Sequence, residues 1–251
     1  MHAVWNPVQY LKFAEERTRP CQELAARIQV ERPARLIDLG CGPGNSTQVL
    51  AARWPESRIT GLDSSPDMID AARKSAPRFE WVRADIAEWA ADAGERFDVV
   101  FSNAALQWVG SHEQLFQRLF ARVAPGGALA IQVPGNYHAP QHQALRSMAT
   151  SRPVTEWHAH DLDFYYDVLA PPASRLDFWA TEYLHIMANA EAIVEWYKGS
   201  ALRPYLQAID TAEEREQFLA EYLERIRPLF PPRSDGRVIF PFRRILMIAS
   251  R

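Results

Sequence analysis

The run Asp38-Leu39-Gly40-Cys41-Gly42-Pro43-Gly44 is the part of the sequence whose residue types and spacing point most directly to chemistry. It follows an apolar Leu-Ile pair and leads into a predicted helix over residues 45–54, which indicates a strand, a glycine turn and a helix. The spacing fits neither the dinucleotide fingerprint Gly-x-Gly-x-x-Gly nor a P-loop, which ends in Gly-Lys-Ser/Thr. Glycines let the backbone approach a ligand closely, and the first turn of the following helix offers free N–H groups to an anion. The motif therefore predicts a site for a nucleotide-like ligand.

Three further groups of residues follow predicted strands in the same half of the chain. Asp63 ends the second strand, about 20 residues beyond the glycine turn, where a carboxylate can accept both hydroxyls of a ribose. Asp85 and Ile86 follow the third strand, where they can bind an adenine amino group and pack on its ring; residues 102–108 follow the fourth. Taken singly, each acid is more simply explained as a helix or turn cap. Because ligands of open α/β sheets bind at the carboxyl ends of the strands, the four groups together predict a ligand with adenine and ribose.

The elements that must position these residues alternate between strand and helix, the pattern of a parallel sheet flanked by helices. Strands are predicted at 36–39, 59–63, 79–83, 99–102 and 128–133, and helices near 21–28, at 45–54, from Ser65-Pro66-Asp67 to about 75, and from about 113. The turn Pro125-Gly126-Gly127 is expected to close that last helix before the fifth strand.

Beyond Pro134 the pattern changes. Residues 136–178 crowd aromatics, prolines and histidines without a clean period, which predicts an irregular cap. Alternating apolar runs at 179–187 and 238–249 predict a final antiparallel strand pair, and 190–198 and 211–227 have helical spacing. We expect one domain over 1–251, with a core at 31–134, cap insertions at 135–178 and 188–235, and the strand pair at 179–187 and 238–249.

Composition and charge exclude several classes of protein. With 251 residues, 47% of them hydrophobic, the chain can bury one large core. A net charge of −3 gives no global field for nucleic acid or an anionic membrane, so neither is an expected partner. The two cysteines, Cys21 and Cys41, lack metal-ligand spacing, and no metal site is expected. Without a secretion signal or an apolar run of about 18 residues, a cytoplasmic protein is expected. The sequence makes no prediction about oligomeric state.

These motifs resemble those of the class I S-adenosylmethionine-dependent methyltransferases. More narrowly, the chain resembles the trans-aconitate methyltransferases over nearly its whole length. That resemblance rests on Trp5-Asn6-Pro7-x-x-Tyr10, Phe13-Ala14-x-Glu16-Arg17, Asn45-Ser46-Thr47, Leu62-Asp63-Ser64-Ser65-Pro66-x-Met68-Ile69, Tyr165-Tyr166-Asp167 and Leu202-Arg203-Pro204. It implies an α/β, Rossmann-like fold: a mostly parallel seven-stranded sheet with helices on both faces and a helical or irregular cap.

The resemblance also implies S-adenosylmethionine as the cofactor. The glycines would wrap its methionine end, Asp63 would hold its ribose, and Asp85 with Ile86 its adenine. An N-terminal segment, 1–30, would cover it through Trp5 and Tyr10, although these aromatics can equally anchor a loose terminus to the body. The implied cofactor-binding residues are Trp5, Tyr10, Asp38, Gly40, Gly42, Gly44, Asp63, Ser64, Met68, Asp85, Ile86, Asn103, Ala104 and Trp108.

Methyl transfer to a carboxylate needs no general base, because a carboxylate with a pKa near ~4 is already ionised at pH 7. We therefore nominate no catalytic residue, and we expect catalysis from orientation, which can contribute roughly 7 to 11 kcal/mol. A tricarboxylate must meet several positive partners when it loses its water. We expect two or more arginines on the spectator carboxylates and weaker donors on the reacting one, since a bidentate arginine would lower its nucleophilicity; any single arginine is more often a surface residue. The candidates are Arg17, Arg146, Arg203 and Arg244, then Tyr137, His138, Tyr165, Tyr166 and His185, with Trp196 as a wall.

Two alternatives stay open at this point. Ser102-Asn103 with Leu106-Gln107-Trp108 also resembles the malonyl-carrier-protein methyltransferases, within a wider class of small-molecule O-methyltransferases. Such an enzyme should present a basic patch to its acidic carrier, and the sequence concentrates basic residues only at Arg32-Pro-Ala-Arg35 and Arg243-Arg244. The other alternative is a protein that binds S-adenosylmethionine without catalysis.

Overall fold

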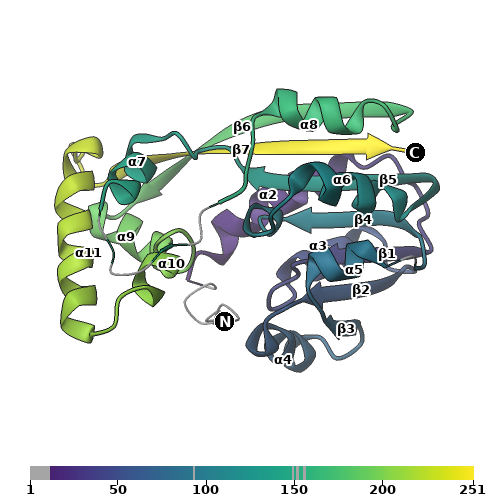
Figure 1. Cartoon of the computed structure of the whole chain (residues 1–251), viewed down its shortest axis with the longest axis horizontal. Coiled ribbons are helices and arrows are strands. Elements are labelled where there is room, and N and C mark those ends of the chain that lie inside the picture. The colour runs from purple at the N-terminus through teal and green to yellow at the C-terminus, as the bar shows by residue number, and fades with distance from the viewer. Residues whose placement is uncertain (1–11, 93, 149, 151–152, 155–156) are drawn as a thin grey trace.

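The computed structural model describes residues 12–92, 94–148, 150, 153–154 and 157–251, which form one sheet of seven strands with helices on both faces (Figure 1). The strands are β1 (Arg35–Leu39), β2 (Arg58–Asp63), β3 (Glu80–Arg83), β4 (Phe97–Asn103), β5 (Val123–Pro134), β6 (Arg175–Met187) and β7 (Val238–Ser250). The helices are α2 (Ala14–Arg27), α3 (Asn45–Arg53), α4 (Pro66–Ser75), α5 (Ile86–Ala91), η1 (Leu106–Trp108), α6 (His112–Ala121), α7 (Pro140–Arg146), α8 (Leu162–Leu169), α9 (Ala190–Lys198), α10 (Leu202–Gln207), α11 (Ala212–Ile226) and η2 (Arg227–Leu229). In these described ranges no helix is long and apolar enough to cross a membrane.

The strand order is β3-β2-β1-β4-β5-β7-β6. Strands β1 to β5 pair in parallel, β7 runs antiparallel to β5, and β6 runs antiparallel to β7. The prediction of a mostly parallel seven-stranded sheet is confirmed. The order reverses between β1 and β4, and ligands of open α/β sheets bind at such a switch point. The hydroxyl of Ser102 donates to the carbonyl of Leu39 at 2.8 Å and joins the ends of these two strands.

Alternation along β1 divides the core between the two faces of the sheet. Leu36 packs with Leu24 of α2 and Leu50 of α3, whereas Ile37 packs with Phe116 of α6 on the other face. Strands that are buried on both faces need continuous apolar runs, and this is why the core strands could be located from the sequence.

The cap is carried by β6 and β7, which pair from Arg175↔Ser250 to Met187↔Val238. The far half of this pair packs with α7, α9, α10 and α11 around Trp196 and Phe240. Figure 1 shows this group at the end of the molecule opposite to β3.

Two predictions about local structure were wrong. The stretch 136–178 contains α7 and α8, and α8 packs on α6 of the body rather than in the cap, because its Tyr165 and Leu169 join the cluster of Phe116. The turn 125–127 lies inside β5, where the register with β4 shifts, and α6 already ends at Ala121. Short helices and a bulged strand give too few repeats to show a period.

Candidate active site

The glycine turn lies at the carboxyl end of β1, and its conformation explains why glycines occur there. The φ angles of the three glycines are 70°, 54° and 95°, in the left-handed region that residues with a Cβ avoid. The carbonyl of Leu62 accepts hydrogen bonds from the N–H groups of Gly40 at 2.7 Å and Cys41 at 3.0 Å, so the turn is tied to β2. A Cβ on Gly40 would lie 2.1 Å from the Cβ of Ala105, so any residue other than glycine would force a neighbouring atom to move.

Asp38, predicted as a cofactor-binding residue, lies behind this turn and is not among the residues that line the cofactor cavity. Its carboxylate is fully buried, and Oδ2 accepts hydrogen bonds from the hydroxyls of Ser46 and Thr47, each at 2.6 Å. Asp38 therefore fixes the start of α3 from inside. Burial raises the pKa of Asp38 to about 6, although the two hydroxyl bonds lower it.

The raised pKa of Asp38 predicts how the stability of the ligand-free protein depends on pH. The pKa of this carboxyl is 3.8 in the unfolded chain and about 6 in the folded protein, so the folded state holds the proton more tightly. The free energy of unfolding gained from this proton is therefore fully present below pH 3.8 and is lost as the pH rises through about 6. At 1.36 kcal/mol per unit this amounts to about 3 kcal/mol. Asp38→Asn should remove this contribution while its amide oxygen keeps the hydroxyl bonds. Urea unfolding of both proteins should show their stability difference changing up to about pH 6 and constant above it; a difference independent of pH would contradict the burial effect.

Two acids at the ends of β2 and β3 have both structural and ligand-facing roles. Asp63 Oδ2 accepts from the N–H of Gly42 at 3.0 Å and Oδ1 from the N–H of Ser65 at 2.9 Å, so it supports the glycine turn from below. Burial raises the pKa of Asp63. Asp85 caps α5, since its Oδ1 accepts from two backbone N–H groups of the first turn at 2.7 and 3.1 Å. Both side chains also line one cavity.

We call this space the cofactor cavity. It is lined by Gly40, Gly42, Asp63, Ser64, Met68, Asp85, Ile86, Asn103, Ala104, Ala105, Trp108 and Val109. The structure thus brings together the residues predicted for the cofactor within the described ranges, except Asp38 and Gly44. Gly44 lies at the start of α3 instead, against the ring of Trp81.

A smaller hollow continues from the cofactor cavity toward α2. Gly40 and Asn103 line both spaces, and Arg17 of α2 reaches the smaller one. The side-chain oxygens Asn103 Oδ1 and Asp38 Oδ1 are buried, and neither has a hydrogen-bond partner among the residues described. Buried acceptors are normally satisfied, so these two fit a ligand with a donor group such as an ammonium.

An acceptor cavity adjoins the cofactor cavity at Ala104 and Trp108, which line both. The residues around it are Arg17, Ala104, Gln107, Trp108, Pro134, Trp157, Trp196, Gly199, Ser200, Phe242 and Arg244. Arg17 donates from Nη2 to the carbonyl of Trp196 at 3.2 Å, and its guanidinium lies 5.0 Å from the centre of the Trp196 ring. Aromatic walls with buried cations suit a planar anion.

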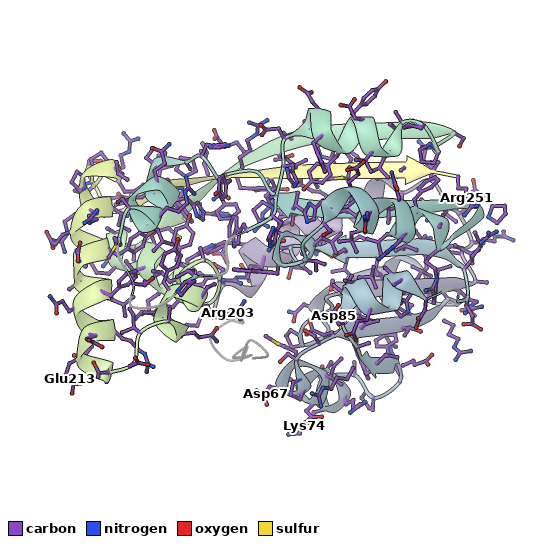
Figure 2. All side chains as sticks on the ribbon, in the orientation of Figure 1. Asp67, Lys74, Asp85, Arg203, Glu213 and Arg251 are labelled. Atoms are coloured by element: carbon purple, nitrogen blue, oxygen red, sulfur yellow. The ribbon has the colours of Figure 1, made fainter. Side chains whose placement is uncertain are left out.

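Arg203 of α10 is not among the lining residues of the acceptor cavity but contacts Trp108, which is. Its guanidinium lies 4.9 Å from the centre of the Trp108 ring, and burial lowers its pKa to about 10, which leaves it charged at neutral pH. Figure 2 shows Arg203 of the cap and Asp85 of the body on the facing sides of these two parts of the molecule. Arg17, Arg203 and Arg244 thus come from three different elements to the surroundings of Trp108 and Trp196.

Comparison with known proteins agrees with this geometry. Residues 36–127 match a family model described as a methyltransferase domain. A trans-aconitate 2-methyltransferase of Paracidovorax citrulli is 45% identical to the chain, covering 98% of each, and one of Azoarcus is 45% identical, covering 98% of the chain and 99% of the relative. The chain belongs to the trans-aconitate 2-methyltransferase family. The predicted resemblance is therefore confirmed.

Solved structures confirm the fold of the family member described here. YcgJ of Bacillus subtilis has a TM-score of 0.63 at 12% identity, covering 93% of this chain and 98% of that one. Phosphoethanolamine N-methyltransferase 2 of Haemonchus contortus, solved with S-adenosyl-L-methionine, has a TM-score of 0.60 at 14% identity, covering 97% of this chain and 56% of that one.

The structure corrects the placement of both α8 tyrosines, which were candidates for the acceptor site. Tyr165 is buried in the body, where its hydroxyl lies 3.0 Å from His112 Nδ1 and accepts from the N–H of His160 at 3.1 Å. Tyr166 on the next helical position is 55% exposed beside Phe178. Neither lines the acceptor cavity, because α8 packs on α6.

The candidates after β5 are also placed elsewhere. Arg146 donates to the carbonyl of Tyr137 at 2.8 Å and stacks on its ring at 4.1 Å, so its guanidinium stabilises the start of the cap. His138 is exposed. None of these three side chains lines the acceptor cavity.

His185 lies one layer behind the cavity wall, with its ring centre 4.9 Å from that of Trp196. Burial and then the charges of Arg244 and Arg19 lower its pKa to about 4, so it is neutral at pH 7. Trp196 itself lines the cavity as predicted. Trp5 and Tyr10 lie outside the described residues.

Sequence reasoning missed Trp157, Ser200 and Phe242 of the acceptor cavity, together with Gln132 behind Arg244. Only Gln132 left a signal in the sequence, as one polar residue within the apolar run of β5.

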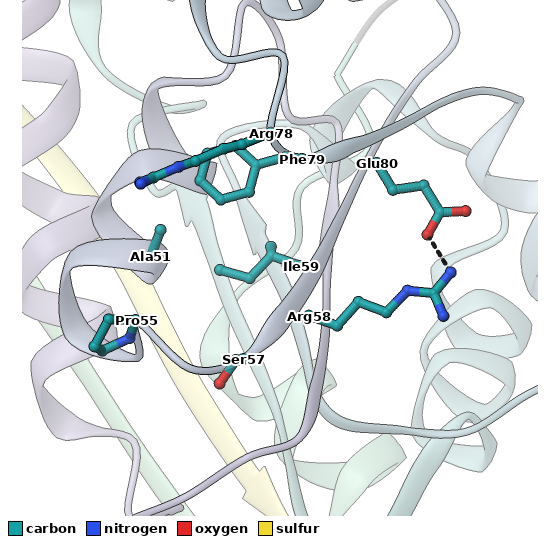
Figure 3. Close-up of a pocket in the computed structure, with 8 residues that line it drawn as sticks. All are labelled: Ala51, Pro55, Ser57, Arg58, Ile59, Arg78, Phe79 and Glu80. Atoms are coloured by element: carbon teal, nitrogen blue, oxygen red, sulfur yellow. Dashed lines mark hydrogen bonds and ion pairs between the residues drawn. The ribbon is translucent and has the colours of Figure 1, made fainter.

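A separate hollow lies at the opposite edge of the sheet, at the amino ends of β2 and β3 (Figure 3). There Arg58 forms an ion pair with Glu80 at 2.9 Å beside Phe79. This hollow lies away from the switch point and so is separate from the candidate active site.

Among the described residues no group of three or more His, Cys, Asp or Glu side chains is placed to hold a metal ion.

Proposed function

We propose that this protein transfers the methyl group of S-adenosylmethionine to a carboxylate of trans-aconitate, giving the monomethyl ester and S-adenosylhomocysteine. The observation that carries the proposal is that two different cavities meet at Ala104 and Trp108. One offers acids and glycines for a nucleoside, and the other offers arginines between aromatic walls for a planar polyanion. The shared name of the relatives supplies the identity of the acceptor.

The residues present fit S-adenosylmethionine. Asp63 would accept from the ribose hydroxyls, and the oxygen of Asp85 that does not cap α5 would accept from the adenine amino group. Met68 and Ile86 would pack on the adenine ring, and Asn103 Oδ1 would accept from the ammonium group. Bound there, the cofactor supplies an electrophilic methyl group on its sulfonium.

The protein contributes charge and orientation to the acceptor rather than acid–base catalysis. Arg17, Arg203 and Arg244 would bind carboxylates, and Trp108 and Trp196 would exclude water around them. A carboxylate is ionised at neutral pH and needs no proton transfer. Holding this carboxylate in line with the methyl group can lower the activation free energy of transfer by roughly 7 to 11 kcal/mol.

The test is transfer of labelled methyl from S-adenosylmethionine to trans-aconitate, beside cis-aconitate, citrate and malonyl-carrier protein at equal concentration. We expect trans-aconitate to be methylated most efficiently. Preference for the carrier protein would identify the protein as a carrier-directed enzyme. Cofactor binding without transfer to any acid would instead indicate a non-catalytic binding protein.

Arg203→Ala should raise the KM for trans-aconitate about 10- to 100-fold, since a hydrogen bond to a charged group contributes about 1.5–3 kcal/mol. The affinity for S-adenosylhomocysteine should stay unchanged, because Arg203 does not line the cofactor cavity. Arg225→Ala is the matched control, as Arg225 is an exposed cap arginine paired with Glu221. Steady-state kinetics check both variants, and an unchanged KM would remove Arg203 from the site.

A further inference from the structure

Gln132 is a fully buried amide on β5, in the middle of the sheet. Its Oε1 accepts a hydrogen bond from Nη1 of Arg244 at 3.0 Å. Its Nε2 is buried and has no hydrogen-bond partner in the part of the chain that the structure describes. Burying a polar group costs free energy of folding unless the group is hydrogen-bonded. The presence of a half-satisfied amide in an otherwise apolar strand therefore needs an explanation.

The position of Gln132 connects it to the centre of the site. It pairs in register with Asn103, and its carbonyl accepts from the N–H of Ala104 at 2.9 Å. Ala104 has φ 57°, a strained value for a residue with a Cβ, and lines both cavities. Gln132 itself lines neither, so any influence on the acceptor must pass through a neighbour.

That neighbour is Arg244 on β7. It is 3% exposed, lines the acceptor cavity, and its guanidinium lies 4.6 Å from the centre of the Phe242 ring. The contact with Gln132 fixes one edge of the guanidinium with a neutral oxygen. A glutamate of the same shape would make the same contact as an ion pair and compete with an incoming carboxylate.

We propose that Gln132 is a positioning residue that orients Arg244 toward a carboxylate of the acceptor without neutralising its charge. This inference rests on the proposed function, because the anion bound by Arg244 is taken to be the acceptor. The amide of Gln132 fixes the orientation of the guanidinium, and the charge of Arg244 attracts the carboxylate.

The test compares Gln132→Glu with the wild-type protein, and then the same change in an Arg244→Ala background. Gln132→Glu should raise the KM for trans-aconitate about 10- to 100-fold. The Kd of S-adenosylhomocysteine should change less than about twofold, because Gln132 does not line the cofactor cavity. In the Arg244→Ala background the same change should have little further effect, since a residue that acts through Arg244 is coupled to it.

An unchanged KM, or an equal rise in both backgrounds, would overturn the inference and leave Gln132 as a structural residue. Gln132→Met, which keeps the volume but makes no hydrogen bond, repeats the cycle if the charged variant does not fold; it should raise the KM only when Arg244 is present. A wild-type protein that methylates no tricarboxylate would mean failure of the proposed function. An active wild type with an insensitive Gln132 would mean failure of this inference alone.

Discussion

Asp63→Ala should weaken the binding of S-adenosylmethionine and S-adenosylhomocysteine by at least 10- to 100-fold. The variant loses the acceptor for the ribose hydroxyls, and each bond to a carboxylate contributes about 1.5–3 kcal/mol. It also loses the bonds from the N–H groups of Gly42 and Ser65, which hold the glycine turn and the start of α4. Isothermal titration with S-adenosylhomocysteine measures the effect directly.

Asp67→Ala is the matched control for that experiment. Asp67 is an exposed acid in the first turn of α4, four residues beyond Asp63, and it lies at the lower edge of the molecule in Figure 2. It does not line the cofactor cavity, so the Kd should not change. Equal losses in the two variants would mean that the negative charge near α4 matters, and not the position of Asp63.

Gly40→Ala should destabilise the protein by about 2–5 kcal/mol even without ligand. A left-handed φ of 70° costs a residue with a Cβ about 1–2 kcal/mol. The methyl group would also lie 2.1 Å from the Cβ of Ala105, and such overpacking costs about 1–3 kcal/mol. Urea unfolding measures the stability, and cofactor affinity should fall as well because the turn must move.

Gly126→Ala separates the two causes. Gly126 has a similar φ of 76°, but a Cβ there would meet nothing within 4 Å. This variant should lose only the backbone contribution, about 1–2 kcal/mol, and should bind cofactor normally. Equal destabilisation of the two variants would show that the clash with Ala105 relaxes without cost.

Arg17 differs from Arg203 because it lines two of the spaces in the site. Arg17 lines both the acceptor cavity and the hollow beside the glycine turn, and it is attached to the backbone of α9 through Trp196. One residue of α2 therefore contacts the places where both ligands would bind. The contributions of Arg17 to cofactor and to acceptor should be inseparable by single substitution, unlike those of Arg203.

The cofactor half could be predicted from the sequence because its chemistry is attached directly to strand ends. The glycine turn, Asp63, Asp85 and Asn103 each end or follow one of the strands β1 to β4. Parallel strands bring their carboxyl ends to one edge of the sheet, so the order of motifs along the chain already gives their order in space. The exceptions were Asp38 and Gly44. Asp38, one position before the end of β1, is buried inside the protein, and Gly44 lies at the start of α3 against Trp81.

The acceptor half was decided only by the tertiary structure. Arg17, Arg203 and Arg244 lie on α2, α10 and β7. Arg17 and Arg203 belong to motifs of the family resemblance, but no periodicity or charge pattern separates the three from Arg146, which donates to the carbonyl of Tyr137 instead. Whether an arginine reaches the site depends on how the cap helices pack on the far half of β6 and β7, over contacts between residues far apart in the chain. Local pattern carries no information about such packing. The sequence could therefore predict that arginines and aromatic residues form the acceptor site, whereas the packing of the cap determines which of them do.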